Sequence, residues 1–280
     1  MDTVSGARTD AARLPIPASD GPDFDRPSIA RMYDYLMGGS RHAEADREVA
    51  HHAVHAAPRI KLTIWENRKA LKRIVRYLVG EGITQILDIG SGIPARGAVH
   101  SVAQAVNPAV KVVYVDIDPV AAARGVELLV DNPNGASAQG DLSEAEQVLA
   151  LPEVTSMLDF SKPVALLFLN VLHFVDPVRV TAALAVFRDA LAPGSYLAIT
   201  HGTADQSNDG DDISKVYAEA YGFAHWRTKE ELVELFGDFQ LVEPGVAQLS
   251  DWRPEPSPLS GALLKGEALN CYAAVGIKAG

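Results

Sequence analysis

The sequence of 280 residues has very little cysteine, no excess of positive charge and no long hydrophobic run. Its one cysteine, Cys271, lies in an apolar stretch, so no disulfide can form within the chain and we expect a buried structural thiol. The formal net charge of −11 argues against a nucleic-acid partner, because binding a phosphate backbone needs clustered lysine and arginine. With no signal-peptide pattern and no segment long enough to span a membrane, we expect a cytoplasmic protein.

The remaining composition is that of an ordinary soluble protein, with 48% hydrophobic and 22% charged residues. Residues 1–25 are rich in alanine, aspartate, proline and glycine, and we expect a flexible leader there. Residues 26–82 show helical spacing of apolar residues in three runs, which predicts an N-terminal helical cap. Residues 83–280 alternate short apolar runs with amphipathic segments, which predicts a mostly parallel sheet covered by helices.

Seven strands are predicted in this second part of the chain. They cover residues 85–89, 111–115, 136–139, 164–169, 196–200, 240–242 and 270–277. Helices are expected between the first five of them, as in a Rossmann-like α/β fold.

The turn after the first predicted strand is the strongest chemical signal. It contains Gly90, Ser91 and Gly92, and glycine lets a chain turn sharply and lets a ligand approach its backbone. In an open α/β sheet such a turn faces the crevice where nucleotide-like ligands bind. Asp88 precedes Gly90 by two residues, and its carboxylate favours a positively charged ligand over a pyrophosphate. S-adenosylmethionine, with an amino group and a sulfonium, is such a ligand.

Two further acidic residues follow the next two predicted strands. Asp116 ends the second strand and could accept hydrogen bonds from ribose hydroxyls. Asp141 ends the third, and with the Leu142 amide it could bind an adenine edge, while Ile117 could pack on the adenine ring. Because right-handed crossovers bring these strand ends to one edge of the sheet, we expect Asp88, which could hold the ligand amino group, to lie beside them.

Three polar residues follow the fourth and fifth predicted strands. His173 and His201 are expected to face the crevice, where either could remove a proton from a methyl acceptor. The alternative for each is a hydrogen-bonded structural histidine. Asn170 could contact cofactor or substrate through its amide.

Several segments together resemble an actinobacterial family of S-adenosylmethionine-dependent methyltransferases, formerly catalogued as a domain of unknown function. The matching segments are residues 27–39 (PSIARMYDYLMGG), 87–94 (LDIGSGIP), 113–116 (VYVD), 172–175 (LHFV), 244–246 (PGV) and 252–254 (WRP). The resemblance implies a class I methyltransferase fold, in which a seven-stranded sheet ends in an antiparallel strand. It also implies bound S-adenosylmethionine and a helical cap, carrying Tyr33 and Arg68, that closes over the cofactor.

Two other functions stay open at this point. A regulatory protein that binds the cofactor without transferring a methyl group is suggested by an altered glycine turn and by Ile117, where the family has asparagine. A nicotinamide-dependent oxidoreductase is suggested by the Gly-x-Gly-x-x-Ala pattern of residues 90–95, although Asp88 would repel a pyrophosphate. We expect methyl transfer to a small-molecule acceptor.

A metal site is not expected. His51 and His55 share one face of a predicted helix, a spacing that can bind zinc, but no convincing third ligand is adjacent. An exposed polar face of the helix explains them better.

Overall fold

The computed structural model describes residues 22–94, 97–203, 205, 209–255 and 269–280. Most of the predicted leader, residues 1–21, lies outside this part of the chain. Among the described helices, none has the length and apolar character needed to cross a membrane.

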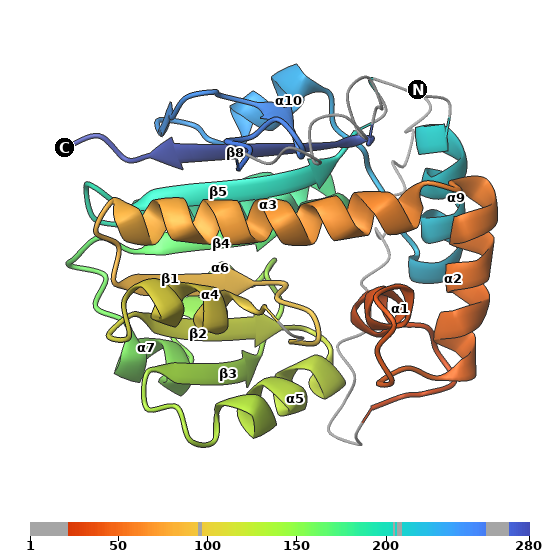
Figure 1. The fold of residues 1–280 in the computed structure, drawn as a ribbon, viewed down its shortest axis with the longest axis horizontal. Coiled ribbons are helices and arrows are strands. Elements are labelled where there is room, and N and C mark those ends of the chain that lie inside the picture. The colour runs from red at the N-terminus through yellow and green to blue at the C-terminus, as the bar shows by residue number, and fades with distance from the viewer. Residues whose placement is uncertain (1–21, 95–96, 204, 206–208, 256–268) are drawn as a thin grey trace, which may run out of the picture.

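One sheet forms the centre of the molecule (Figure 1). Its strands are β1 (Gln85–Ile89), β2 (Lys111–Asp116), β3 (Gly135–Gln139), β4 (Ala165–Leu169), β5 (Tyr196–Gly202), β6 (Gln240–Leu241), β7 (Ala247–Gln248) and β8 (Cys271–Ile277). The order is β3-β2-β1-β4-β5-β8-β6, and β7 also pairs with β8. The first five strands are parallel, while β8 runs antiparallel to β5, which confirms the predicted α/β fold. The two-residue strand β7 is an addition to the seven expected strands.

Helices cover both faces of this sheet. One apolar cluster joins the sheet to α3 (Ile60–Gly80), α4 (Val99–Val106) and the end of α5 (Pro119–Leu129). A second cluster joins the other face to α6 (Ala145–Leu149), α7 (Pro152–Met157), α8 (Pro177–Ala190) and α10 (Lys229–Glu234). All five residues of β1 are therefore buried, as expected for a central parallel strand.

Acidic and hydroxyl side chains determine where several helices begin. Asp118 caps α5 and accepts hydrogen bonds from two backbone amides, and Pro119 follows as the first helical residue. Asp176 and Pro177 begin α8 in the same way. Thr228 forms a capping box with Glu231 at the start of α10. Each cap satisfies backbone donors that a helix start leaves free, so these boundaries follow directly from the sequence.

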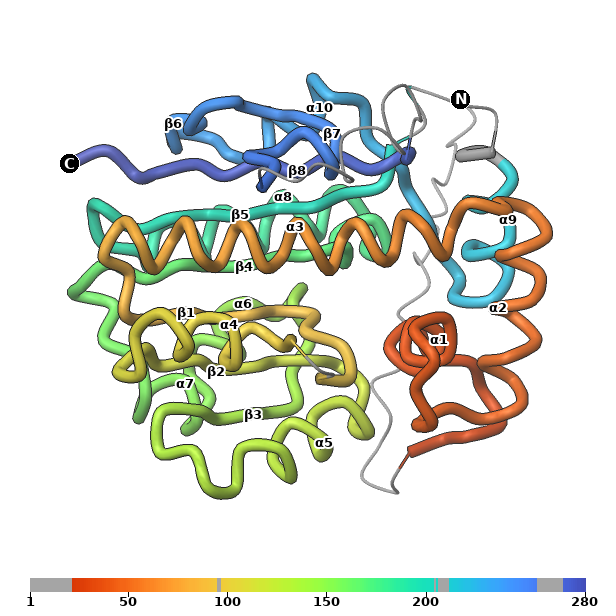
Figure 2. Tube along the Cα trace, in the orientation of Figure 1, coloured from red at the N-terminus to blue at the C-terminus, as the bar shows by residue number. Residues whose placement is uncertain are grey.

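A third apolar cluster lies beyond the carboxyl ends of the parallel strands. It is formed by α1 (Ile29–Leu36), α2 (Glu44–Ala56), α9 (Asp209–Tyr221) and the first turns of α3, which we call the cap (Figure 1). Helix α3 is long enough to join both parts (Figure 2). Its Ile64 packs in the cap, whereas Ile74 and Leu78 pack on the sheet. The cap is thereby placed directly over the edge of the sheet where ligands of this fold bind.

Candidate functional site

The strand order reverses between β1 and β4, and open α/β sheets bind ligands at such a point. Gly90 follows β1 with φ +69°, and a Cβ atom there would lie 2.3 Å from Cγ2 of Val171, which follows β4. Only glycine allows this close approach. Asn170, between β4 and Val171, has φ +63°, a left-handed conformation that asparagine adopts more readily than most other residues with a side chain. The strand ends therefore meet in a tightly specified arrangement.

Asp116 holds the glycine turn in place. It is 7% exposed, and its two carboxylate oxygens accept hydrogen bonds from the backbone amides of Gly92 at 2.7 Å and Asp118 at 2.9 Å. Burial raises the pKa of Asp116 to about 6, although these hydrogen bonds act in the opposite direction. A carboxylate can accept about four hydrogen bonds, so Asp116 retains capacity for ribose hydroxyls. Next to it, Ile117 is 38% exposed and offers an apolar surface.

Asp88 is a buried carboxyl group whose hydrogen-bonding capacity is unused. It is 4% exposed and makes no side-chain hydrogen bond to another described residue. Burial raises its pKa to about 7; the charge of Arg68 opposes this rise and the charge of Asp116 adds to it. Burying a carboxyl without a donor is costly, and a ligand ammonium would supply donors. Apart from Gly92 and its two chain neighbours, no atom of the described residues lies within 4 Å of a Cβ built at Gly92, so space is available beside the turn.

The side chains around this turn have the chemistry needed to bind S-adenosylmethionine. Asp88 offers an acceptor for the amino group, and Asp116 offers acceptors for the ribose. Arg68 lies at the same turn, where its Nη2 donates a hydrogen bond to the Gly97 carbonyl at 3.4 Å. The structure thus brings Asp88, Asp116 and Arg68 together.

Asp141 follows β3 at the same edge of the sheet and mainly orders its own turn. Its Oδ1 accepts hydrogen bonds from the amide and hydroxyl of Ser143 at 2.9 and 2.6 Å, and its Oδ2 lies 3.5 Å from Arg179. The Leu142 side chain is buried. An adenine contact through Asp141 and the Leu142 amide stays a prediction.

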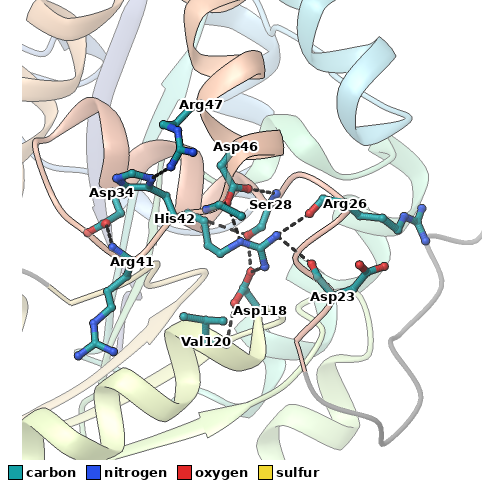
Figure 3. A network of polar contacts seen from close by, with 12 residues as sticks. Asp23, Arg26, Ser28, Asp34, Arg41, His42, Asp46, Arg47, Asp118 and Val120 are labelled. Atoms are coloured by element: carbon teal, nitrogen blue, oxygen red, sulfur yellow. Dashed lines mark hydrogen bonds and ion pairs between the residues drawn. The ribbon is translucent and has the colours of Figure 1, made fainter.

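A buried ionic network ties the cap to the turn that carries Asp116 (Figure 3). Arg31 of α1 is 3% exposed and forms ion pairs with Asp46 at 2.9 Å and with Asp118 at 3.3 Å. The Ser28 hydroxyl also donates to Asp118, and the Ser28 amide donates to Asp46 at 2.8 Å. Because the Asp118 amide binds Asp116, the network links the first helix of the cap to the proposed ribose site.

A cavity of about 260 Å³ lies between the cap and the ends of β4, β5 and β8. Its apolar walls include Met32, Ile60, Ile64, Phe174, Ile213 and Trp226. Tyr33 also lines it, and its hydroxyl accepts a hydrogen bond from Asn67 at 3.3 Å and donates to the Ile64 carbonyl at 3.4 Å. Burial raises the pKa of Tyr33, so its phenol is neutral. Asn170 and Cys271 form part of the same lining.

The two predicted histidines differ in what their ring nitrogens contact. His201 donates from Nδ1 to the Gly202 carbonyl at 2.6 Å and accepts at Nε2 from Arg227 at 2.8 Å, so both nitrogens are occupied. His201 therefore cannot take a proton from a substrate unless one of these bonds breaks. His173 is 1% exposed and lines the cavity, and its Nδ1 has no hydrogen-bond partner. Burial, together with His201 and Arg227, lowers the pKa of His173 well below its ordinary value.

Trp226 forms a wall of the cavity because residue 202 is glycine. A Cβ atom at Gly202 would lie 1.9 Å from Cζ3 of Trp226, so any larger residue would displace the indole. Trp226, Tyr217 and Cys271 line the cavity but were not predicted as site residues. They lie far apart in the sequence and carry no motif, so only the folded chain shows that they share one cavity.

The predicted histidine pair on α2 lies outside this site. His51 Nε2 is 2.9 Å from the Tyr35 hydroxyl. Over the described ranges, no group of three or more histidine, cysteine, aspartate or glutamate side chains is arranged to hold a metal ion.

Comparison with known proteins agrees with this geometry. Residues 17–279 match the family model described as S-adenosyl methyltransferase. A crystal structure from Thermobifida fusca YX, assigned as a methyltransferase, has 41% identity and a TM-score of 0.87, covering 92% of this chain and 97% of its own. A protein of the DUF574 family from Streptomyces avermitilis MA-4680 has 32% identity and a TM-score of 0.85, covering 91% and 99%.

More distant structures share the fold alone. Mitomycin 7-O-methyltransferase has 17% identity and a TM-score of 0.51, covering 90% of this chain and 69% of its own. No curated protein matches the sequence. The strand order, the buried acidic turn and the family match over nearly the whole chain lead to one conclusion: the chain belongs to the S-adenosyl methyltransferase family, whose cofactor is S-adenosylmethionine.

Proposed function

We propose that the protein transfers the methyl group of S-adenosylmethionine to a small-molecule acceptor bound in the cavity beneath the cap. The observation that carries this proposal is the buried Asp88 carboxyl, to which no residue of the described ranges donates a hydrogen bond, next to the turn that Asp116 holds. An acceptor in the cavity would lie on the same edge of the sheet, at the ends of β4 and β5. The bound cofactor supplies a methyl group that its sulfonium activates.

Each residue at the polar turns has a proposed task. Asp88 binds the amino group, and Asp116 accepts hydrogen bonds from the ribose hydroxyls. Gly90, Ser91 and Gly92 let the backbone pass close to the ligand. The carboxyl groups of Asp88 and Asp116 have unused hydrogen-bonding capacity, and there is open space beside Gly92. Both features support these tasks.

The remaining predicted contacts complete the cofactor site. Ile117 packs on the adenine ring, while Asp141 and the Leu142 amide bind its edge. Asn170 contacts the ligand at the end of β4. On the cap side, Tyr33 and Arg68 cover the cofactor.

The protein contributes mainly position and exclusion of water. In-line placement of an acceptor atom against a bound methyl donor can supply roughly 7–11 kcal/mol of the barrier in favourable cases. The apolar walls of the cavity keep water away from the acceptor. A small organic acceptor fits a cavity of about 260 Å³, which is slightly below the range typical of drug-sized ligands.

Asp116→Ala tests the cofactor site. We expect S-adenosylmethionine to bind more weakly by roughly 1–3 kcal/mol, because the ribose hydroxyls lose a charged acceptor. Isothermal titration calorimetry measures this change. Asp159→Ala is the matched control, since Asp159 is an exposed acid whose side chain bonds only to Ser161 and Lys162.

An affinity unchanged by Asp116→Ala would show that the ribose is held elsewhere. Transfer is measured separately, with a labelled methyl group and fractions of small molecules from cell extract. Tight cofactor binding with no labelled product in any fraction would favour the regulatory alternative. Binding of NADH would favour the oxidoreductase.

A further inference from the structure

The His173 side chain is held firmly and lacks hydrogen-bond partners. Its backbone carbonyl accepts a hydrogen bond from the His225 amide at 2.8 Å. Its ring packs against three others, with centroid distances of 4.2 Å to Phe174, 4.6 Å to Trp226 and 5.1 Å to His201. The Nδ1 atom is fully buried, and neither ring nitrogen bonds to another described residue. A buried imidazole left in this state requires an explanation. Its Nε2 atom, unlike Nδ1, is not fully enclosed, so Nε2 is the nitrogen that a ligand in the cavity would meet.

Neighbouring charges keep this imidazole neutral. Arg227 lies behind it, donating hydrogen bonds to His201 at 2.8 Å and to the Leu172 carbonyl at 3.4 Å. A second positive charge so close to a buried guanidinium is unfavourable, so His173 enters the reaction with a free lone pair. A neutral imidazole offers one donor and one acceptor. His201 cannot replace it, because both of its nitrogens are occupied.

The walls of the cavity limit the chemistry of its occupant. Among the described lining residues there is no aspartate or glutamate, but Arg59 is present. A cationic amine would therefore find no carboxylate there and would meet a positive charge. The rings of Tyr33, Phe174, Tyr217 and Trp226 line the space, and Phe174 and Tyr217 lie 5.3 Å apart between centroids. Aromatic walls favour a flat ring, which can stack or meet them edge to face.

We propose that the acceptor is a small aromatic compound with a hydroxyl group and no positive charge, that the oxygen is methylated, and that Nε2 of His173 accepts the hydroxyl proton. This proposal rests on the proposed function. An O–CH₃ bond forms as the C–S bond breaks, the C–S electron pair remains on sulfur, and the proton passes to the His173 ring. The sulfonium loses its positive charge in the same step in which the imidazole gains one, so the total charge in the site is unchanged.

Binding to the protein saturated with S-adenosylhomocysteine tests this assignment. The probes are 2-naphthol, 2-methoxynaphthalene and 2-naphthylmethylammonium, measured by calorimetry. We expect 2-naphthol to bind, and the methylated and cationic probes to bind at least tenfold more weakly. His173→Phe should weaken 2-naphthol binding about tenfold, because it keeps the ring and removes the nitrogens. It should also lower the rate of methyl transfer to 2-naphthol by about 10²-fold or more.

Three controls separate the possible causes of failure. His52→Phe changes an exposed histidine on α2 and should leave every value unchanged. If His173→Phe does not fold, His173→Asn retains a polar group at the position, and it should likewise weaken 2-naphthol binding. In both variants the affinity for S-adenosylhomocysteine should stay within about twofold of the wild type, since the cofactor turn is not altered.

The proposal is overturned if the wild type does not bind 2-naphthol, or if the cationic probe binds as tightly. An unchanged 2-naphthol affinity in a folded His173 variant would also overturn it. Failure of S-adenosylhomocysteine to bind the wild type would instead count against the proposed function itself, so the two failures are distinguishable.

Discussion

Two neighbouring regions of the molecule depend on different interactions. Polar contacts form the turns after β1 and β2, whereas apolar packing forms the cavity beneath the cap. At the turns, the Asp116 carboxylate binds backbone amides, and the buried carboxyl group of Asp88 lies near the charge of Arg68. In the cavity, apolar side chains from segments as far apart as Ile29 and Cys271 form the walls. Hydrogen bonds and charges demand particular atoms at particular places, whereas apolar packing tolerates exchanges of similar volume. A chain of this design can change its acceptor without rebuilding its cofactor site.

We expect the largest effect when a buried charge is removed from the network beside the polar turns. Arg31→Met leaves the buried carboxylates of Asp46 and Asp118 without their cation. We expect the free energy of unfolding to fall by about 3–5 kcal/mol, measured by urea denaturation. S-adenosylhomocysteine should also bind more weakly, because Asp118 positions Asp116.

Arg76→Met is the matched control for Arg31. Arg76 pairs with Glu255 on the surface, where both side chains are more than half exposed. Its loss should cost at most about 1 kcal/mol. Equal losses for the two variants would show that the buried network contributes no more than a surface ion pair.

A second prediction concerns pH. The folded protein retains a proton on Asp88 up to about pH 7, whereas the unfolded chain releases it near pH 4. The free energy of unfolding without cofactor should therefore fall as pH rises from about 4 to 7, by on the order of 3 kcal/mol from Asp88 alone. Urea denaturation at pH 5, 6 and 7 measures this slope, and Asp88→Asn should remove the Asp88 part of it.

His201, whose ring packs against that of the cavity residue His173, should show the opposite dependence. The pKa of His201 is lowered to about 3 by burial and Arg227, so the unfolded chain binds the proton more readily between about pH 3 and 6.5. The contribution of His201 to the free energy of unfolding therefore rises with pH between about pH 3 and 6.5. Identical pH profiles for Asp88→Asn and the wild type would contradict the assignment of the falling part to Asp88.

The smallest expected effect lies in the cavity wall. Ile64→Val removes one methylene that faces the cavity, and we expect a loss of stability of about 0.5–1.5 kcal/mol in thermal unfolding. Cofactor affinity should be unchanged. Ile74→Val, in the fully packed contact between α3 and the sheet, is the control and should cost at least as much. A marked loss of cofactor affinity in Ile64→Val would mean that the two regions are not independent.

The polar turns could be predicted because their signals are local. An apolar run followed by Gly90 and Gly92 marks a strand end and a tight turn, and the structure places β1 at residues 85–89 as expected. Asp118 followed by Pro119 marks a helix start. Helix α2 likewise lies within residues 26–82, where the apolar spacing predicts three helical runs. Such features depend on residues that are close together in the chain.

Features built from distant contacts could not be predicted. The occupied nitrogens of His201 depend on Arg227, a residue of a later loop. The pairing of Arg31 with Asp118 joins two segments 87 residues apart. Helix α7 and strand β7 are too short for their periodicity to show in the sequence. The cavity itself has no sequence signal, because it is the space that remains after several elements have packed.

The contact between Gly202 and the Trp226 indole gives one backbone position control over how large a substrate can enter. Adding a single methyl group at the end of β5 would push an aromatic wall aside by more than an ångström, while strands β1 to β3, which carry the proposed cofactor contacts, would be untouched. Relatives with another residue here would therefore be expected to select differently shaped molecules with the same catalytic machinery.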